Sequence, residues 1–133
     1  MLAGINWIAV FVSAVAGYAL GAMWYMPKVF GNAWMVAMGK KPEELGSPAQ
    51  AMTVAAVTTL ITAVCLAVIL KGCTIITLSA GIVMGIVIGG GLVFASMLSD
   101  HMFQGKTMQL LWIQGGYRFV YIVLMCAIIG AWQ

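Results

Sequence analysis

Residues 75–98, IITLSAGIVMGIVIGGGLVFASML, form a long apolar stretch that no charged side chain interrupts. A helix needs about 20 apolar residues to cross the hydrocarbon core of a bilayer, and this stretch supplies them. Three further apolar stretches, residues 5–26, 48–70 and 108–132, are long enough to do the same. We therefore predict an all-α integral membrane protein in which a single domain, residues 1–133, crosses the membrane with four transmembrane helices.

The overall composition agrees with a chain that is surrounded by membrane lipids. Hydrophobic residues make up 64% of the sequence and charged residues 7%, whereas a soluble domain carries about 25% charged residues. Six basic and three acidic side chains give a net charge of +3. These charges are too sparse to form the basic stripe of a nucleic-acid-binding protein, so we expect no nucleic-acid partner.

The loop between the first and second spans is predicted to contain a short interfacial helix. Phe30, Trp34 and Met38 recur at every fourth position within residues 29–38, which places three apolar side chains on one helical face. Such a segment buries its apolar face at the level of the lipid headgroups and leaves its polar face in water.

The lysines indicate how the chain is oriented. Cytoplasmic loops of membrane proteins are rich in lysine and arginine. The second loop contains Lys71 alone, whereas the first and third loops contain the other four lysines. The asymmetry predicts that the first and third loops are cytoplasmic and that both termini lie on the non-cytoplasmic side. The four lysines are Lys28, Lys40, Lys41 and Lys106.

Small residues recur at every fourth position along three spans, a pattern typical of closely packed membrane helices. Lipid chains are as apolar as the helices, so close contact between small side chains must hold the helices together. The stripes are Ala9, Ser13, Gly17 and Gly21 in the first span, Ala51, Ala55, Thr59, Ala63 and Ala67 in the second, and Gly81, Gly85 and Gly89 in the third.

Two interpretations of these stripes remain open. Four short helices have few interior positions, so we expect at least one stripe to serve an interface with another copy or with a larger membrane complex. The alternative is a compact monomer that uses every stripe internally. The Gly89-Gly90-Gly91 run predicts either a bend or a tight helix contact, since each glycine is less favourable than alanine by up to about 1 kcal/mol inside a helix.

Arg118 is the sharpest polar feature, because it lies about ten residues into the last span, about 15 Å from its start. A charge at this depth costs at least about 2.5 kcal/mol and usually lines a cavity or pairs with another group. Gln114 and Tyr121 share its helical face, and Tyr18 lies halfway along the first span. We predict a polar intramembrane site of these four residues, which either binds an anion, a headgroup or a partner's acid, or forms a hydrogen-bonded network.

His101 and Met97 lie one helical turn apart and carry an imidazole and a thioether, which suit Cu(I). Eleven methionines bring one close to a lone histidine by chance, so we interpret His101 as an interfacial residue and expect no metal site. The cysteines lie within or beside apolar stretches and are interpreted as packing residues. No motif for nucleophilic catalysis or phosphate binding occurs, so we expect neither an enzyme nor a cofactor.

Two segments resemble a known family of bacterial membrane proteins. Residues 21–34, GAMWYMPKVFGNAW, are similar to the GxxWYxPxxFGxxW signature of the family catalogued as domain of unknown function 1761. Gly116-Tyr117, Met125 and residues 128–132, IIGAW, resemble its second signature. The resemblance implies a multi-pass, four-helix protein of the bacterial inner membrane and brings no assigned activity.

Two functions follow from these observations. In the first, the chain is an accessory or scaffolding subunit that binds copies of itself or a larger membrane complex through its small-residue faces. In the second, it is a small homo-oligomeric channel or transporter for an ion or polar solute, with Arg118 in the path. We favour the first, because it needs only the packing faces that the sequence contains.

Overall fold

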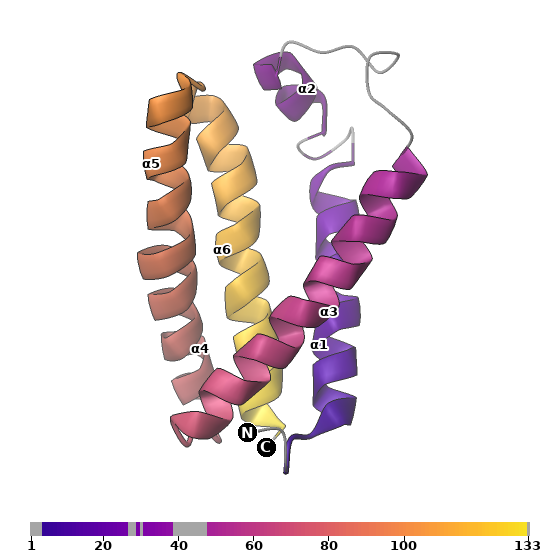
Figure 1. The fold of residues 1–133 in the computed structure, drawn as a ribbon, viewed down its shortest axis with the longest axis vertical. Helices are drawn as coiled ribbons and strands as arrows, with labels where there is room; N and C mark the ends of the chain where they lie inside the picture. Colours follow the sequence, from indigo (N-terminus) through magenta and orange to yellow (C-terminus); the bar gives the residue numbers. More distant parts are fainter. Residues whose placement is uncertain (1–3, 27–28, 30, 39–47, 133) are drawn as a thin grey trace.

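The computed structural model describes residues 4–26, 29, 31–38 and 48–132. Four helices within these ranges are long and apolar enough to cross a membrane, which confirms the predicted all-α membrane architecture. A short helix between the first two lies at one end of the bundle (Figure 1). The elements are α1 (Trp7–Trp24), α2 (Asn32–Met38), α3 (Pro48–Gly72), α4 (Leu78–Ile86), η3 (Val87–Phe94), α5 (Ala95–Gln104) and α6 (Met108–Ala131), of which α4, η3 and α5 form one continuous helix.

Capping side chains fix where three of the long helices begin. The side-chain oxygens of Asn6, Thr77 and Thr107 each accept a hydrogen bond, 3.2 Å long, from the backbone N–H three residues later. Such a cap stabilises a helix by about 1 kcal/mol. The other end of α5 is set by Gly105, whose φ of 69° is accessible to glycine at little cost.

The helix that contains the third predicted span continues beyond residue 98, to Gln104. The polar run Ser99-Asp100-His101 suggests a helix end in the sequence. In the structure the helix continues through this run, because the side chain of His101 is buried against α6.

The first span and the interfacial segment also differ from their predicted bounds. The first span ends at Trp24, two residues before the predicted boundary. The short helix begins at Asn32. Phe30, which was assigned to its apolar face, lies outside the described residues, as do Lys28, Lys40 and Lys41.

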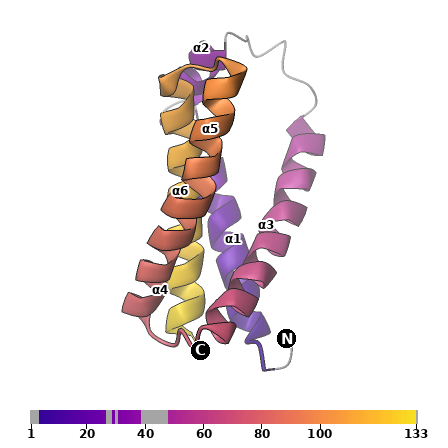
Figure 2. The same ribbon diagram turned by 60° about the vertical axis from the view of Figure 1, so that its left-hand side comes forward.

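The central helix of the bundle is α6, which packs against α1, α3, α4, η3 and α5 (Figure 2). Its side chains Leu111, Tyr121, Met125 and Ile129 are almost completely buried. The faces of the other helices that point away from α6 are apolar and exposed, as expected for surfaces in contact with lipid.

The small-residue stripes are used largely within the chain. A Cβ atom on Gly85 would lie 2.7 Å from the Cα atom of Val123, so the backbones of α4 and α6 are in direct contact. On α1 and on the second half of α3, the stripe residues pack inside the bundle, whereas Ala51 and Ala55 on the first half of α3 are exposed. The packed stripe residues are Ala9, Ser13, Gly17, Thr59, Ala63, Ala67, Gly81, Gly85 and Gly89.

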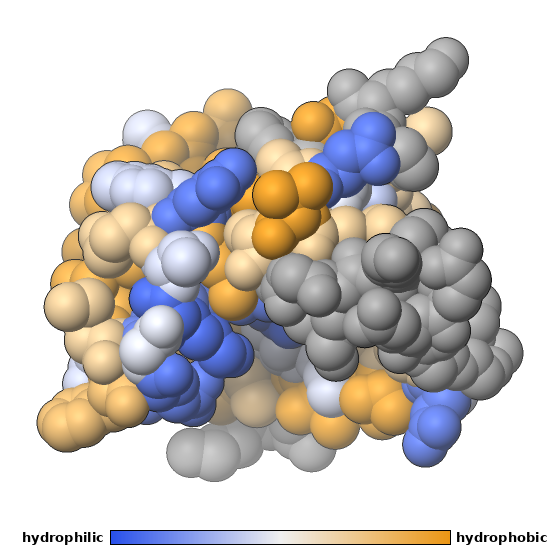
Figure 3. All heavy atoms as spheres, turned by 90° about the horizontal axis from the view of Figure 1, so that it is seen from above, coloured by the Kyte–Doolittle hydropathy of each residue, from blue (hydrophilic) through white to orange (hydrophobic). Residues whose placement is uncertain are grey.

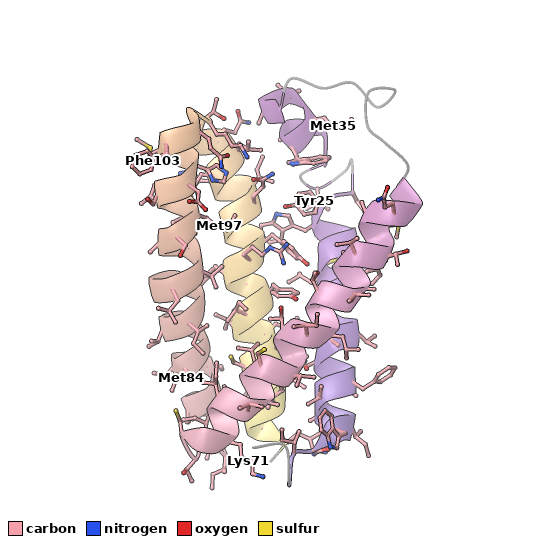
Figure 4. The ribbon with its side chains drawn as sticks, viewed as in Figure 1. Tyr25, Met35, Lys71, Met84, Met97 and Phe103 are labelled. Atoms are coloured by element: carbon pink, nitrogen blue, oxygen red, sulfur yellow. The ribbon has the colours of Figure 1, made fainter. Side chains whose placement is uncertain are left out.

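Aromatic side chains mark the two ends of the bundle. Trp7 and Trp132 are about half exposed at the end that carries both termini, and Trp112 is 63% exposed toward the α2 end. Tryptophan prefers the membrane–water interface, because its ring is apolar and its N–H is polar. Lys71 lies at the end with the termini (Figure 4), and Lys106 lies in the turn between α5 and α6 at the other.

Candidate functional site

A crevice of about 1090 Å³ lies between α1, α3 and α6, in the half of the bundle that carries α2. The last turns of α1 form one wall and the first turns of α3 form the other. Tyr117 and Arg118 contribute the α6 surface, and Trp34 of α2 covers the end. Seen from this end, hydrophilic side chains form patches among apolar ones (Figure 3).

The crevice exists because α3 packs along only part of its length. Its residues 51–58 are all exposed, whereas Ala63, Leu66 and Leu70 are buried. Figures 1 and 2 both show the start of α3 leaning away from α1 and α6. We call residues 50–58 the open half of α3 and residues 59–72 its closed half.

Arg118 lies on the crevice wall and is exposed to it. Its guanidinium carbon is 5.3 Å from the ring centroid of Tyr117 and 5.4 Å from that of Tyr121. Both distances fall within the range in which a cation is attracted to an aromatic ring. Asp100 is the one acidic residue in the described ranges, and it lies on α5, which does not line the crevice. Within these ranges Arg118 therefore has aromatic neighbours and no carboxylate.

Aromatic rings connect α2 to the interior of the bundle. The ring centroids of Trp34 and Tyr25 are 5.4 Å apart, those of Tyr25 and Tyr117 are 5.5 Å apart, and those of Tyr117 and Tyr121 are 5.4 Å apart. Tyr25 lies below α2 at the end of α1 (Figure 4). Tilted and edge-on ring pairs of this kind stabilise a fold beyond the area that they bury.

Two polar atoms of this aromatic cluster are buried without a hydrogen-bond partner in the described part of the chain. They are the indole nitrogen Nε1 of Trp34 and the hydroxyl oxygen of Tyr121. An unsatisfied buried donor is costly, by about 1–3 kcal/mol, so such atoms are uncommon and call for an explanation.

The two segments that resemble family signatures meet at this site. A Cβ atom on Gly21 would lie 2.7 Å from the hydroxyl oxygen of Tyr117, so a larger residue would displace that ring. Trp24 donates a hydrogen bond of 3.0 Å from Nε1 to the backbone carbonyl of Ile113. The ring of Trp24 also lies in ordinary contact distance, 3.4 Å, of a Cβ placed on Gly116.

The structure divides the four residues of the predicted polar site. Tyr18 and Arg118 both line the crevice. Tyr121 lies beneath the guanidinium and is 1% exposed, so its ring belongs to the core. Gln114 does not bind Arg118, because its side-chain oxygen lies 3.2 Å from Nε2 of His101.

His101 joins α5 to α6 through that contact with Gln114. Its Nδ1 atom lies 2.8 Å from the backbone carbonyl oxygen of Met97. Met97 therefore contacts the imidazole through its main-chain carbonyl group. Both ring nitrogens are engaged, which explains how a polar side chain tolerates burial at this position.

The sequence interpretation missed Tyr25, Trp34 and Tyr117 as members of the site. Tyr25 and Tyr117 lie inside predicted spans, where an aromatic residue is usually a packing residue, and Trp34 was assigned only to the apolar face of the interfacial helix, so composition gives no reason to single these out. The available signal was the resemblance, since the two signature segments together contain all three residues.

These features define a multi-pass helical membrane protein with a crevice, lined by aromatic residues and one arginine, in one half of the bundle. The chain belongs to the family described as protein of unknown function (DUF1761), which matches residues 8–130 and confirms the resemblance. No curated protein and no solved structure is significantly similar to the chain.

Proposed function

We propose that this protein binds an anionic ligand in the crevice and that Arg118 holds the negative charge. The observation that carries the proposal is the position of the guanidinium, which lies on the wall of a crevice of about 1090 Å³ without a carboxylate among the described residues. An intramembrane arginine is costly unless a partner group compensates its charge. A bound anion supplies that compensation.

The geometry around Arg118 suits a planar or tetrahedral acid. Tyr117 and Tyr121 engage the guanidinium through their rings, and no hydrogen bond from it to a described residue competes for its N–H groups. Those groups form a fork that matches the two oxygens of a carboxylate or phosphate. An attraction between opposite charges is also stronger in the low dielectric of a membrane than in water.

The packing of the other half of the bundle favours a binding pocket over a channel. The closed half of α3 buries Ala63, Leu66 and Leu70 against the neighbouring helices. A channel would need polar side chains along this half as well, and the buried residues there are predominantly apolar. The proposal therefore places the ligand in one half of the membrane.

We further propose that the crevice belongs to the cytoplasmic half of a bacterial inner membrane and that both termini lie on the opposite side. The distribution of lysines between the loops supports this orientation. A reporter fused after residue 133 tests it. Alkaline phosphatase should be active there and green fluorescent protein should be dark, and the reverse pattern would invert the orientation.

The binding proposal is tested with purified protein in a mild detergent and two probes, inorganic phosphate and decyl phosphate. A ligand that binds only the folded state raises the thermal midpoint of unfolding. We expect at least one probe to raise it for the wild type and for Lys71→Gln, which removes a cation at the other end. Arg118→Gln should abolish the shift. If neither probe stabilises the wild type, or if Arg118→Gln responds equally, the proposal is wrong.

A second candidate is the accessory role, in which a partner's acidic group occupies Arg118. The exposed small residues Ala51 and Ala55 support it, because they offer a face for close helix contact. In this case a second copy or a larger membrane complex should co-purify in mild detergent and dissociate on Arg118→Gln. If the wild type and Arg118→Gln both purify as monomers, the accessory role is wrong.

A further inference from the structure

We infer that the anionic ligand is a membrane lipid, with its headgroup on Arg118 and a hydrocarbon chain along the open half of α3. This inference rests on the proposed binding of an anion at Arg118 and specifies the chemical class of that ligand. Three features of the crevice carry it: its predominantly apolar wall, the place of the guanidinium along α6, and an unsatisfied donor at the end of the crevice.

The wall formed by α3 is predominantly apolar, with Gln50, Thr58 and Thr59 as its polar members, and it is continuous with the surface that faces lipid. Met52 and Val54, which line the crevice, are 51% and 56% exposed. Leu60 and Ile61, on the following turn, are also about half exposed. A small hydrated anion gains nothing from such a wall. A hydrocarbon chain fits it, because it moves from surrounding lipid into contact with apolar side chains without crossing water.

The place of Arg118 along α6 suits a headgroup that has access from one leaflet. The residue lies about 15 Å along the helix from its start, and side chains on a helix tilt toward its N-terminus. The N-terminus of α6 is at the α2 end, so the long side chain can direct its charge toward the headgroup region of that leaflet while its stem stays among apolar groups.

Trp34 provides a second polar group at the end of the crevice. Its Nε1 atom is buried and makes no hydrogen bond with any described residue, although Trp34 itself forms part of the crevice wall. A phosphodiester headgroup offers acceptor oxygens for both a guanidinium and an indole N–H, and the ring of Trp34 would have to turn to present its buried N–H to the crevice. A lipid therefore matches one charged donor, one neutral donor and an apolar wall, whereas free phosphate uses only the first two.

The experiment places the protein in nanodiscs of phosphatidylcholine that contain a small fraction of phosphatidylglycerol with brominated acyl chains. Bromine quenches tryptophan fluorescence at short range, and the contribution of Trp34 is the difference between the wild type and Trp34→Phe. We expect this contribution to be quenched saturably at low fractions of the anionic lipid. Brominated phosphatidylcholine at the same fractions should quench it far less.

Two charge variants complete the design. Arg118→Gln should raise the fraction of anionic lipid needed for half quenching about tenfold or more, as expected for the loss of one charge-assisted contact. Lys106→Gln removes a cation at the same end of the bundle but outside the crevice, and should leave that fraction unchanged. Equal effects of the two variants would indicate general attraction to the surface and would overturn the inference.

The outcomes separate the lipid inference from the proposed function. Stabilisation by inorganic phosphate without preferential quenching by the anionic lipid would leave the binding function standing and overturn the lipid inference. A response to neither would overturn both. Should Trp34→Phe fail to fold, native mass spectrometry of protein released from mixed nanodiscs gives the same comparison. The wild type should then retain phosphatidylglycerol, and Arg118→Gln should lose it.

Discussion

The two halves of α3 share one sequence pattern and differ in what they contact. The stripe of small residues runs through both, from Ala51 and Ala55 in the open half to Thr59, Ala63 and Ala67 in the closed half. In the closed half the stripe is buried against α1 and α6. In the open half the same stripe lines the crevice.

The difference between the halves comes from the helices that α3 faces. Toward the termini, where α1 and α3 pack together, the buried side chains of α1 are small or medium, namely Ala9, Val10 and Ser13. Toward α2, the crevice is lined by Tyr18 and Tyr25 of α1 together with Tyr117 and Arg118 of α6. A small-residue stripe permits close packing, but whether a neighbouring helix packs against the stripe depends on the size of the side chains that face it.

The largest expected effect comes from placing a bulky side chain in the close contact between α4 and α6. Gly85→Leu forces a side chain into the backbone of Val123, so we expect a loss of about 3 kcal/mol or more in the free energy of unfolding. Gly91→Leu is the matched control, because no atom lies within 4 Å of its Cβ position. Unfolding in detergent, followed by circular dichroism, measures both, and equal stabilities would contradict the close contact.

A matched pair on α3 tests the two surfaces of one helix directly. Leu70 is fully buried and Leu60 is 47% exposed. Leu70→Ala leaves a cavity and should lower the free energy of unfolding by about 2–3 kcal/mol. Leu60→Ala exchanges contacts with lipid and should change it by less than about 0.5 kcal/mol. The same unfolding assay applies. If both variants lose a similar amount of free energy of unfolding, Leu60 and Leu70 do not differ in burial as the structure shows.

The smallest expected effect concerns the polar contact between His101 and Gln114, which joins α5 to α6. Gln114→Leu removes the partner of a buried imidazole and should cost about 1 kcal/mol. Gln109→Leu makes the same chemical change at an exposed position of α6 and should be close to neutral. If the two variants unfold at the same denaturant concentration, the contact between His101 and Gln114 does not contribute to stability.

The sequence was sufficient to predict the number of spanning helices, because apolar length alone decides whether a segment can cross a bilayer. It was insufficient for the end of the third helix, because the polar run Ser99-Asp100-His101 gives no sign that the imidazole of His101 is buried. The partner of Gln114 was also missed, because the sequence places Gln114 one turn from Arg118 and carries no signal that His101 packs against α6. The crevice depends on aromatic volumes brought together from α1, α2 and α6, and no local pattern encodes that meeting.

The wide helical segment η3 decides which side chains of α5 reach α6. Gly81 and Gly85 of α4 and Gly89 of η3 face α6 at intervals of four; Phe94, the last residue of η3, lies over Gly115, an interval of five from Gly89. A regular α-helix turns 100° per residue and would carry that ring away from its neighbour, whereas a π-helical turn absorbs one additional residue. The π-helical segment that contains the three consecutive glycines thus accommodates one residue more than a regular α-helix would. Shortening the run by one residue should therefore convert η3 into regular α-helix and leave α5, with its histidine, facing α6 as before.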